Sequence, residues 1–144
     1  MHQPIAASIA AMAFMWSVIG NAAPHQPHQA DMDAAAREHW EAPPDEASRQ
    51  NPIVPDSMSI ERGKQFFQTH CTGCHGPSGL GDGPVAAALT PKPANLVTMG
   101  PHHSDGDLAW KIAEGRNSMP GWRGALKAED VWDLVNYIRS LGRE

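Results

Sequence analysis

The sequence predicts an all-α fold in which three main helices surround a long loop rich in glycine and proline. Three observations support this fold class. Apolar residues recur at helical spacing near the C-terminus, no segment alternates as a strand does, and Gly and Pro contribute 13 residues each to a chain of 144. Only 41% of the residues are apolar. A chain with so few regular elements needs a large bound apolar group to complete its core.

The first helix is expected over residues 60–70. Ser59 is a suitable N-cap, and Glu61 places a negative charge in the first turn, where it favours the helix dipole. The loop rich in Gly and Pro follows at residues 76–101, with room for one short helical turn at residues 85–89. The loop therefore separates the first helix from the other two.

The second and third helices are expected over residues 105–114 and 128–141. Ser104 begins a capping pattern before the second helix, and Gly115 is a natural stop after it. Gly142 ends the third helix. The third helix is the clearest of the three, because five apolar residues form one stripe at helical spacing: Val131, Leu134, Val135, Ile138 and Leu141.

Residues 1–23 have the character of an export signal. An apolar run of about 15 residues is followed by the small residues of GNAA, which suit cleavage. This run fits a signal sequence better than a membrane span, which needs roughly 20 residues. No Lys or Arg precedes it, so an uncleaved membrane anchor is the alternative. Both interpretations place the body of the protein outside the cytoplasm, in the periplasm.

Residues 24–57 are predicted to be an acidic, proline-rich linker before a folded domain at 58–144. The linker carries seven acids against two arginines, whereas residues 58–144 carry nine acids and nine bases. No basic patch indicates nucleic-acid binding. We expect the linker to be largely extended, with a short helix around residues 32–40. Its histidines raise a copper-binding hypothesis, against which a polar, disordered tract is the simpler interpretation; these are His25, His28 and His39, near Met32.

The only two cysteines of the chain lie in the stretch CTGCH, which consists of Cys71, Thr72, Gly73, Cys74 and His75. C-x-x-C-H is the attachment motif of haem c, because each thiol can add to one haem vinyl group and the histidine can bind the iron. A redox dithiol expects a βαβ setting, which is missing from the pattern. A zinc site needs two further ligands, for which only His102 and His103 offer themselves. The motif therefore predicts one covalently attached haem c.

Residues 58–144 resemble the single-haem class I cytochromes c of the bacterial periplasmic branch. The resemblance rests on GKQFF before the first cysteine, HGPSGLGDGP after the second, and NSMPGW before the last helix. It implies the small cytochrome c fold, wrapped around the covalent haem. It also implies that Gly63 and Phe67 pack against Leu134 and Tyr137 of the last helix, since two helices that cross closely need a residue without a side chain at the contact.

The resemblance further implies that Met119, in NSMPGW, is the distal ligand of the iron opposite His75. Thioether and imidazole ligation raises the reduction potential of a haem. Met99 is the rival methionine, and its neighbours His102 and His103 could instead give ligation by two histidines.

Pro84 resembles the family proline whose carbonyl accepts a hydrogen bond from Nδ1 of the proximal histidine, here His75. Such a bond would fix the imidazole ring and raise its basicity. Four further residues could touch the haem or its propionates, although ordinary packing or exposure explains each of them equally well: Asn95, Trp110, Arg116 and Trp122.

An iron bound by both His75 and Met119 has no open position for a substrate. The sequence therefore predicts an electron carrier, not an enzyme by itself, that cycles between Fe(III) and Fe(II) and exchanges electrons with periplasmic redox partners. The first alternative is a haem-carrying subunit or membrane-tethered electron donor of a larger oxidoreductase complex. A ligand-binding or catalytic haem protein with a labile Met119 and a zinc-binding module are the remaining alternatives.

Overall fold

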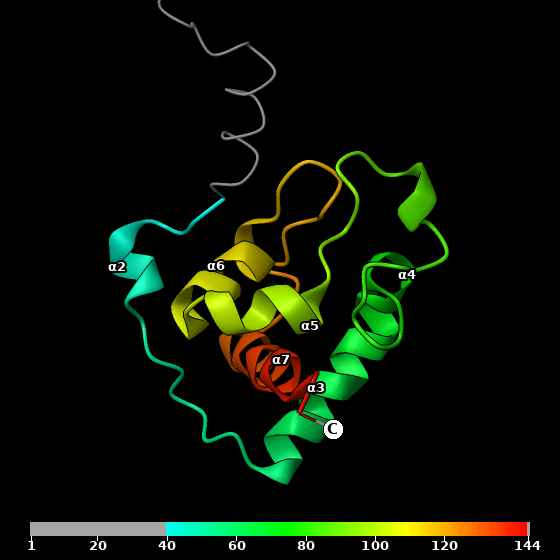
Figure 1. The fold of residues 1–144 in the computed structure, drawn as a ribbon. Coiled ribbons are helices and arrows are strands. Elements are labelled where there is room, and N and C mark those ends of the chain that lie inside the picture. Colours follow the sequence, from blue (N-terminus) through cyan, green and yellow to red (C-terminus); the bar gives the residue numbers. More distant parts are fainter. Residues whose placement is uncertain (1–39, 144) are drawn as a thin grey trace, which may run out of the picture. The chain divides into compact units, whose positions relative to one another are not determined.

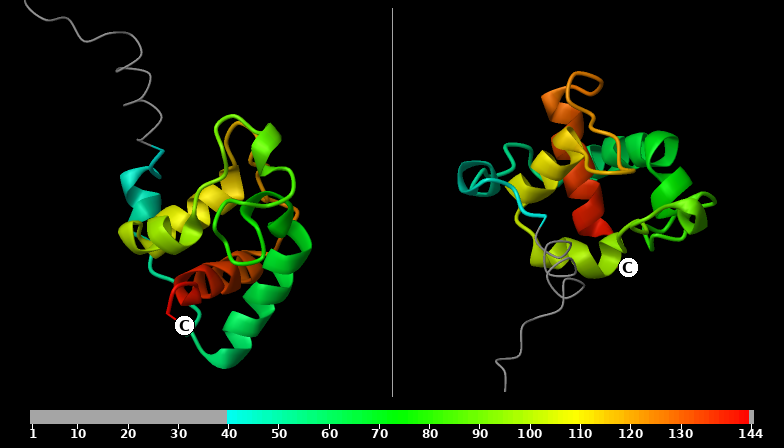
Figure 2. Two further views of the ribbon diagram at one scale, coloured as in Figure 1. Left: turned by 45° about the vertical axis from the view of Figure 1, so that its right-hand side comes forward. Right: turned by 90° about the horizontal axis from the view of Figure 1, so that it is seen from above.

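The computed structural model describes residues 40–143 of the chain (Figures 1 and 2). These residues form helices and turns without a strand, which confirms the all-α class. The predicted signal sequence, the histidines proposed for copper and the short helix at 32–40 lie outside them. The elements in chain order are α2 (Pro44–Ala47), α3 (Ser57–His70), α4 (Thr72–His75), η1 (Ala86–Ala88), α5 (Leu96–Met99), η2 (Gly100–His102), α6 (Asp105–Glu114) and α7 (Ala128–Ser140).

Helices α3 and α7 cross at close range and form the centre of the fold (Figure 1). Gly63 lies at the crossing, where a Cβ atom would come 2.1 Å from the backbone oxygen of Asp133. One turn later the rings of Phe67 and Tyr137 meet with centroids 5.2 Å apart. The expected helix pair is therefore present, and Leu134 belongs to the same buried core.

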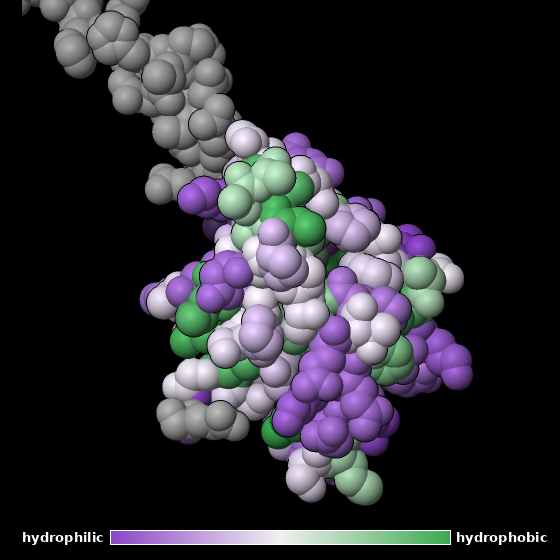
Figure 3. Space-filling view, turned by 90° about the vertical axis from the view of Figure 1, so that its right-hand side faces the viewer, coloured by the Kyte–Doolittle hydropathy of each residue, from purple (hydrophilic) through white to green (hydrophobic). Residues whose placement is uncertain are grey.

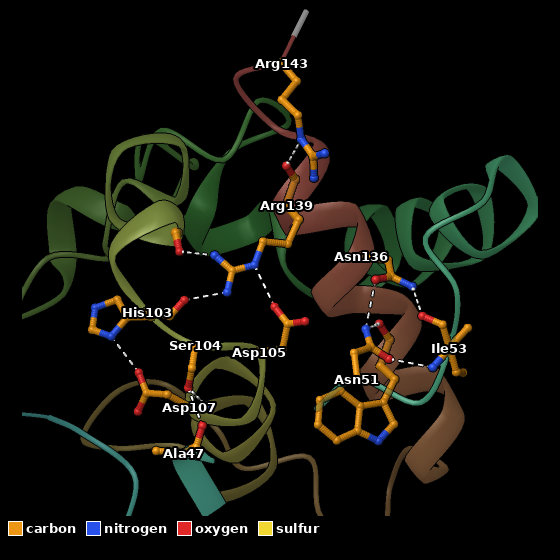
Figure 4. Close-up of polar contacts among 12 residues, drawn as sticks. Ala47, Asn51, Ile53, His103, Ser104, Asp105, Asp107, Asn136, Arg139 and Arg143 are labelled. Carbon is orange, nitrogen blue, oxygen red and sulfur yellow. Dashed lines mark hydrogen bonds and ion pairs between the residues drawn. The ribbon is translucent and has the colours of Figure 1, made fainter. Parts of the chain in front are cut away.

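Helix α6 packs across α7 and matches its predicted bounds. The Ser104 hydroxyl accepts a hydrogen bond from the Asp107 amide at 3.1 Å, as the capping pattern indicated. Arg139 of α7 links this helix to the start of α6 and to the segment before it. Its guanidinium donates to the Asp105 carboxylate at 2.8 Å and to the Gly100 carbonyl at 2.5 Å. Figure 4 shows this arginine between the two helices. Among residues 40–143, no helix combines the length and the apolar character that a membrane span requires.

The predicted start of α3 at a Ser59 cap is wrong. The helix begins at Ser57, and Asp56 is its N-cap, with its carboxylate accepting from the Ser59 amide at 2.8 Å. Ser59 is instead fully buried against α7, where its hydroxyl donates to Asp133 at 2.6 Å and accepts from Asn136 at 2.8 Å. Polar residues of α7 therefore form hydrogen bonds inside the core, and α7 is buried over a wider face than the predicted apolar stripe.

The described part of the predicted linker packs against the helices of the fold. Residues 40–56, here called the strap, run over α6 and α7 to the start of α3 (Figures 1 and 4). The side chain of Asn51 donates to the Asn136 side chain at 2.8 Å and to the backbone oxygen of Trp132 at 3.2 Å. Polar groups of α6 and α7 therefore bind the strap along its length.

Candidate functional site

The two cysteines and the histidine of the C-x-x-C-H motif lie at the end of α3 and in the short helix α4 that follows it. Cys71 is the C-cap of α3, with its amide donating to the Phe67 carbonyl at 2.8 Å, and α4 carries Cys74 and His75. The His75 amide donates back to the Cys71 carbonyl at 2.8 Å. Both cysteines and the histidine are half-buried, and Cys71 packs against the apolar core. The two thiols and the imidazole are thus held close together at the edge of that core.

The surroundings of Cys71 and His75 favour the uncharged form of each side chain. Burial, with a smaller contribution from Cys74, raises the pKa of the Cys71 thiol to about 11. Burial also lowers the pKa of His75, and the hydrogen bond that its Nδ1 makes to the Ala94 carbonyl opposes this shift. A neutral imidazole is the form that binds a metal ion.

The imidazole of His75 is oriented by a backbone carbonyl, but not by the predicted one. Its Nδ1 lies 3.1 Å from the oxygen of Ala94, so the structure gives Ala94 the role expected of Pro84. Pro84 lies in a segment that packs against α4. The amides of its neighbours Gly83 and Val85 donate to the carbonyls of Cys74 and Gly73. With Nδ1 engaged by Ala94, Nε2 of His75 is the nitrogen left to bind a metal ion.

The approach of Ala94 depends on Gly81. This glycine has a φ of 78°, and a Cβ atom there would lie 2.5 Å from the Pro93 oxygen and 3.2 Å from the Ala94 oxygen. Its amide donates to the His75 carbonyl at 2.8 Å. A residue without a side chain therefore lets the chain before α5 come close to His75.

Met119 lies in a tight turn after α6. The amide of Arg116 donates to the Met119 carbonyl at 2.9 Å, and the Met119 amide donates back at 3.0 Å. Beyond the turn, the Trp122 amide donates to the Ile112 carbonyl at the end of α6, at 3.1 Å. The Met119 side chain is half-buried and packs against the apolar core. We call residues 115–124 the Met119 loop.

The Met119 loop lies beside the junction of α3 and α4. The ring of Trp122 contacts the ring of His70, the residue before Cys71, with centroids 4.9 Å apart. His70 in turn stacks on Phe66 at 6.4 Å. The structure therefore brings the sixth-ligand candidate and the C-x-x-C-H turn to the same side of the molecule, although they are more than forty residues apart in the sequence.

The rival ligands are placed less favourably. Nδ1 of His103 lies 2.6 Å from the Asp107 carboxylate and 2.9 Å from the Lys111 ammonium, so it is already engaged. His102 is exposed. Met99, in α5, packs against the apolar core and remains the alternative methionine for the iron ligand.

The four other candidate residues make contacts within the protein. The Asn95 side chain caps α5, accepting from the Val97 amide at 3.0 Å. Trp110 and Arg116 both approach the ring of Trp40, with Trp110 at 6.3 Å between centroids and the Arg116 guanidinium at 5.9 Å. The contact of Trp122 with His70 is described above.

The donor set fits a covalently attached haem. The set comprises two half-buried thiols, an imidazole with its Nδ1 engaged and a half-buried thioether, and two of its members, Cys71 and Met119, pack against the same apolar core. Within residues 40–143, no group of three or more His, Cys, Asp or Glu side chains is arranged to hold a metal ion directly. The zinc alternative therefore gains no support from this part of the chain.

Comparison with known proteins agrees with this chemistry. The family model described as Cytochrome c matches residues 60–142. The chain is 32% identical over 86 residues to a cytochrome c6 of Nostoc sp., which covers 60% of this chain and 71% of that protein. It is 30% identical over 87 residues to the Cbb3-type cytochrome c oxidase subunit FixPc of Rhizobium leguminosarum bv. viciae, covering 60% of this chain and 29% of the subunit.

A solved structure gives a similar result. It belongs to a reducing HAO-like protein complex of Kuenenia stuttgartiensis and aligns with a TM-score of 0.55 at 27% identity. The alignment covers 74% of this chain and 53% of that chain, so this protein corresponds to about half of the solved chain.

Proposed function

The chain belongs to the cytochrome c family, and we propose that Cys71 and Cys74 hold its haem c covalently while His75 and Met119 bind the iron from opposite faces. As a member of this family it is a haem electron-transfer protein. The bound haem supplies the one-electron change between Fe(III) and Fe(II). The task of the polypeptide is to hold the ligands and shape the surroundings.

The observation that carries the proposal is the hydrogen bond between Nδ1 of His75 and the carbonyl of Ala94 at 3.1 Å. It selects the imidazole tautomer that has Nε2 free for iron, and it raises the basicity of the ring. Cys71 lies one helical turn before His75, and Cys74 directly precedes it. This arrangement supports the assignment of the motif as the haem attachment site.

Met119 closes the site on the other side under this proposal. Its thioether is a soft donor that favours ferrous iron, and its turn is fixed by two reciprocal hydrogen bonds with Arg116. An iron with six ligands leaves no position for a substrate. The protein then acts as a one-electron carrier between redox partners, without catalysing a reaction of its own.

The surface beside the motif suits brief contact with another redox protein. Leu80 and Val85, in the loop bonded to α4, are each 46% exposed. Figure 3 shows hydrophobic residues near the upper edge of this face and hydrophilic ones over its lower part. We infer that partners dock on this apolar region, over a small area as is usual for redox encounters. We also propose that the protein acts in the periplasm, as the apolar N-terminus suggested.

A second candidate function is that of a haem-carrying subunit or membrane-tethered electron donor of a larger complex. It is favoured by two of the similar proteins, one described as an oxidase subunit and the other as part of a multi-protein complex. Sequencing the mature N-terminus and separating membrane from periplasmic fractions distinguishes the two. A cleaved N-terminus and a periplasmic protein support the free carrier, and an intact N-terminus in the membrane fraction supports the tethered donor.

The ligand assignment is tested by Met119→Ala, produced with the haem-attachment machinery. We expect the variant to retain its haem through acid–acetone extraction, because Cys71 and Cys74 are intact. It should lose the absorption band of the sulfur–ferric bond, and its reduction potential should fall because the thioether no longer favours ferrous iron. Met99→Ala is the matched control and should keep the band. Loss of the band in Met99→Ala and its retention in Met119→Ala would reverse the assignment.

A further inference from the structure

The strap at residues 40–56 lies before the segment shared with the family, yet α6 carries specific groups that bind it. The Ser104 hydroxyl donates to the Ala47 carbonyl at 2.6 Å (Figure 4). The buried Asp107 carboxylate accepts from the Ala42 amide, also at 2.6 Å. These are hydrogen bonds to backbone groups, which a merely adjacent tether would leave to water.

The fit between strap and helix is also close in space. A Cβ atom at Gly106 would lie 2.1 Å from the Glu46 oxygen and 2.9 Å from the Arg49 oxygen. The strap therefore passes directly over the first turn of α6. Further along, Arg49 lies over the ring of Trp132 at 5.3 Å, and Asn51 bonds to α7 as described. The strap is thus fixed at several points along its length.

Trp40, at the start of the strap, connects it to the Met119 loop. Its ring lies 5.9 Å from the Arg116 guanidinium and 5.7 Å from the Lys111 ammonium, both within the range of a cation–π contact. Trp110 packs against the same ring at 6.3 Å. Lys111 and Trp110 belong to α6, but Arg116 belongs to the loop, so Trp40 bridges the two.

Arg116 is the residue that closes the Met119 turn. Its amide and carbonyl make the two reciprocal hydrogen bonds with Met119, at 2.9 and 3.0 Å. Between them, Asn117 has a φ of 54°, in the left-handed region that residues with side chains rarely adopt. Such a turn persists where its surroundings hold it. A side chain that holds Arg116 therefore also holds the backbone of Met119.

We propose that the strap positions the sixth iron ligand: Trp40 holds Arg116 in place, and Arg116 holds the turn that presents Met119. Trp40 is a positioning residue, since it acts through Arg116 and does not itself contact the haem ligands. This inference rests on the proposed function, because it concerns the strength with which Met119 stays bound.

The test measures how readily cyanide displaces Met119 from the ferric haem protein. In Trp40→Ala we expect the association constant of cyanide to rise about fivefold, which corresponds to about 1 kcal/mol and to one partly exposed cation–π contact. Trp40→Phe keeps an aromatic face and should remain near the wild type. Asn51→Ala is the matched control, since it loosens the strap on α7, away from the Met119 loop.

A second measurement follows hydrogen exchange at the amides of Arg116 and Met119, which should quicken about fivefold in Trp40→Ala and stay unchanged in Asn51→Ala. Unchanged exchange and cyanide binding in Trp40→Ala, or equal increases in both variants, would overturn the role of the strap. If the wild type lacks the sulfur–ferric band, the ligand assignment fails instead. The exchange rates then decide by themselves whether Trp40 holds the turn.

Discussion

The contact at Gly63 makes a quantitative prediction about the crossing of α3 and α7. In Gly63→Ala the new Cβ would lie 2.1 Å from the Asp133 oxygen and 2.6 Å from its carbonyl carbon. The obstacle is backbone, which cannot rotate aside as a side chain can, so we take the upper end of the usual overpacking cost, about 3 kcal/mol. Alanine returns about 1 kcal/mol through its higher helix propensity. The free energy of unfolding should therefore fall by about 2 kcal/mol.

Gly73→Ala is a control with the opposite expected sign. Gly73 also lies in a helix, but a Cβ atom there would have no neighbour within 4 Å, so only the propensity gain of up to about 1 kcal/mol remains. Guanidinium unfolding of both haem-loaded variants, followed by circular dichroism and haem absorption, measures the difference. A Gly63→Ala protein as stable as wild type, or a Gly73→Ala protein that loses as much, would contradict the close crossing as the cause.

Two further predictions follow from the polar contacts. Asp107→Asn should lower stability by about 3 kcal/mol at pH 7, because it leaves the buried Lys111 ammonium without its carboxylate. Burial raises the pKa of Asp107, but hydrogen bonds from Lys111 and Ala42 lower it overall from 3.8. The stability that the wild type holds over Asp107→Asn should therefore be complete above about pH 4 and shrink as the pH falls further. A difference in unfolding free energy that stayed constant between about pH 7 and 3 would contradict this. Gly81→Ala should displace the Ala94 carbonyl from His75 and make the imidazole a weaker donor, so the ferric–ferrous potential should rise, whereas Met119→Ala lowers it. An unaltered potential and visible spectrum would show that the close approach at Gly81 is dispensable.

Local signals in the sequence were sufficient for much of the fold. The bounds of α6 followed from one capping serine and one stopping glycine, and the start of α7 followed from its apolar spacing. The partners Gly63 and Phe67 were identified through the family resemblance, and their contacts with α7 confirm it. These features depend on residues within a few positions of each other or on a pattern that many related proteins share.

The errors all involve polar groups whose partners lie far away in the sequence. Ser59 is a good cap by local rules, but Asp133, 74 positions later, binds its hydroxyl in the core. The strap has the composition of a linker. Its packing could not be read from that composition, because the side chains that bind it lie on α6 and α7. The same holds for the acceptor at His75, which is the Ala94 carbonyl. Every residue has a backbone carbonyl, so the sequence does not show which one will accept the hydrogen bond.

The two loops proposed to carry the iron ligands are held by the same kind of hydrogen bond, which matters for electron transfer. The loop after His75 donates amides to the carbonyls of α4, including that of Cys74, and the Met119 loop donates amides to Ile112 and Ala113 at the end of α6. Carbonyls at helix ends need such partners in any case, so the same bonds that complete the helices also fix the ligands. None of these bonds involves a group that must gain or lose a proton when the iron changes its charge. Under the proposed ligation, the ligands are therefore held alike in both oxidation states, which keeps the structural rearrangement during electron transfer small.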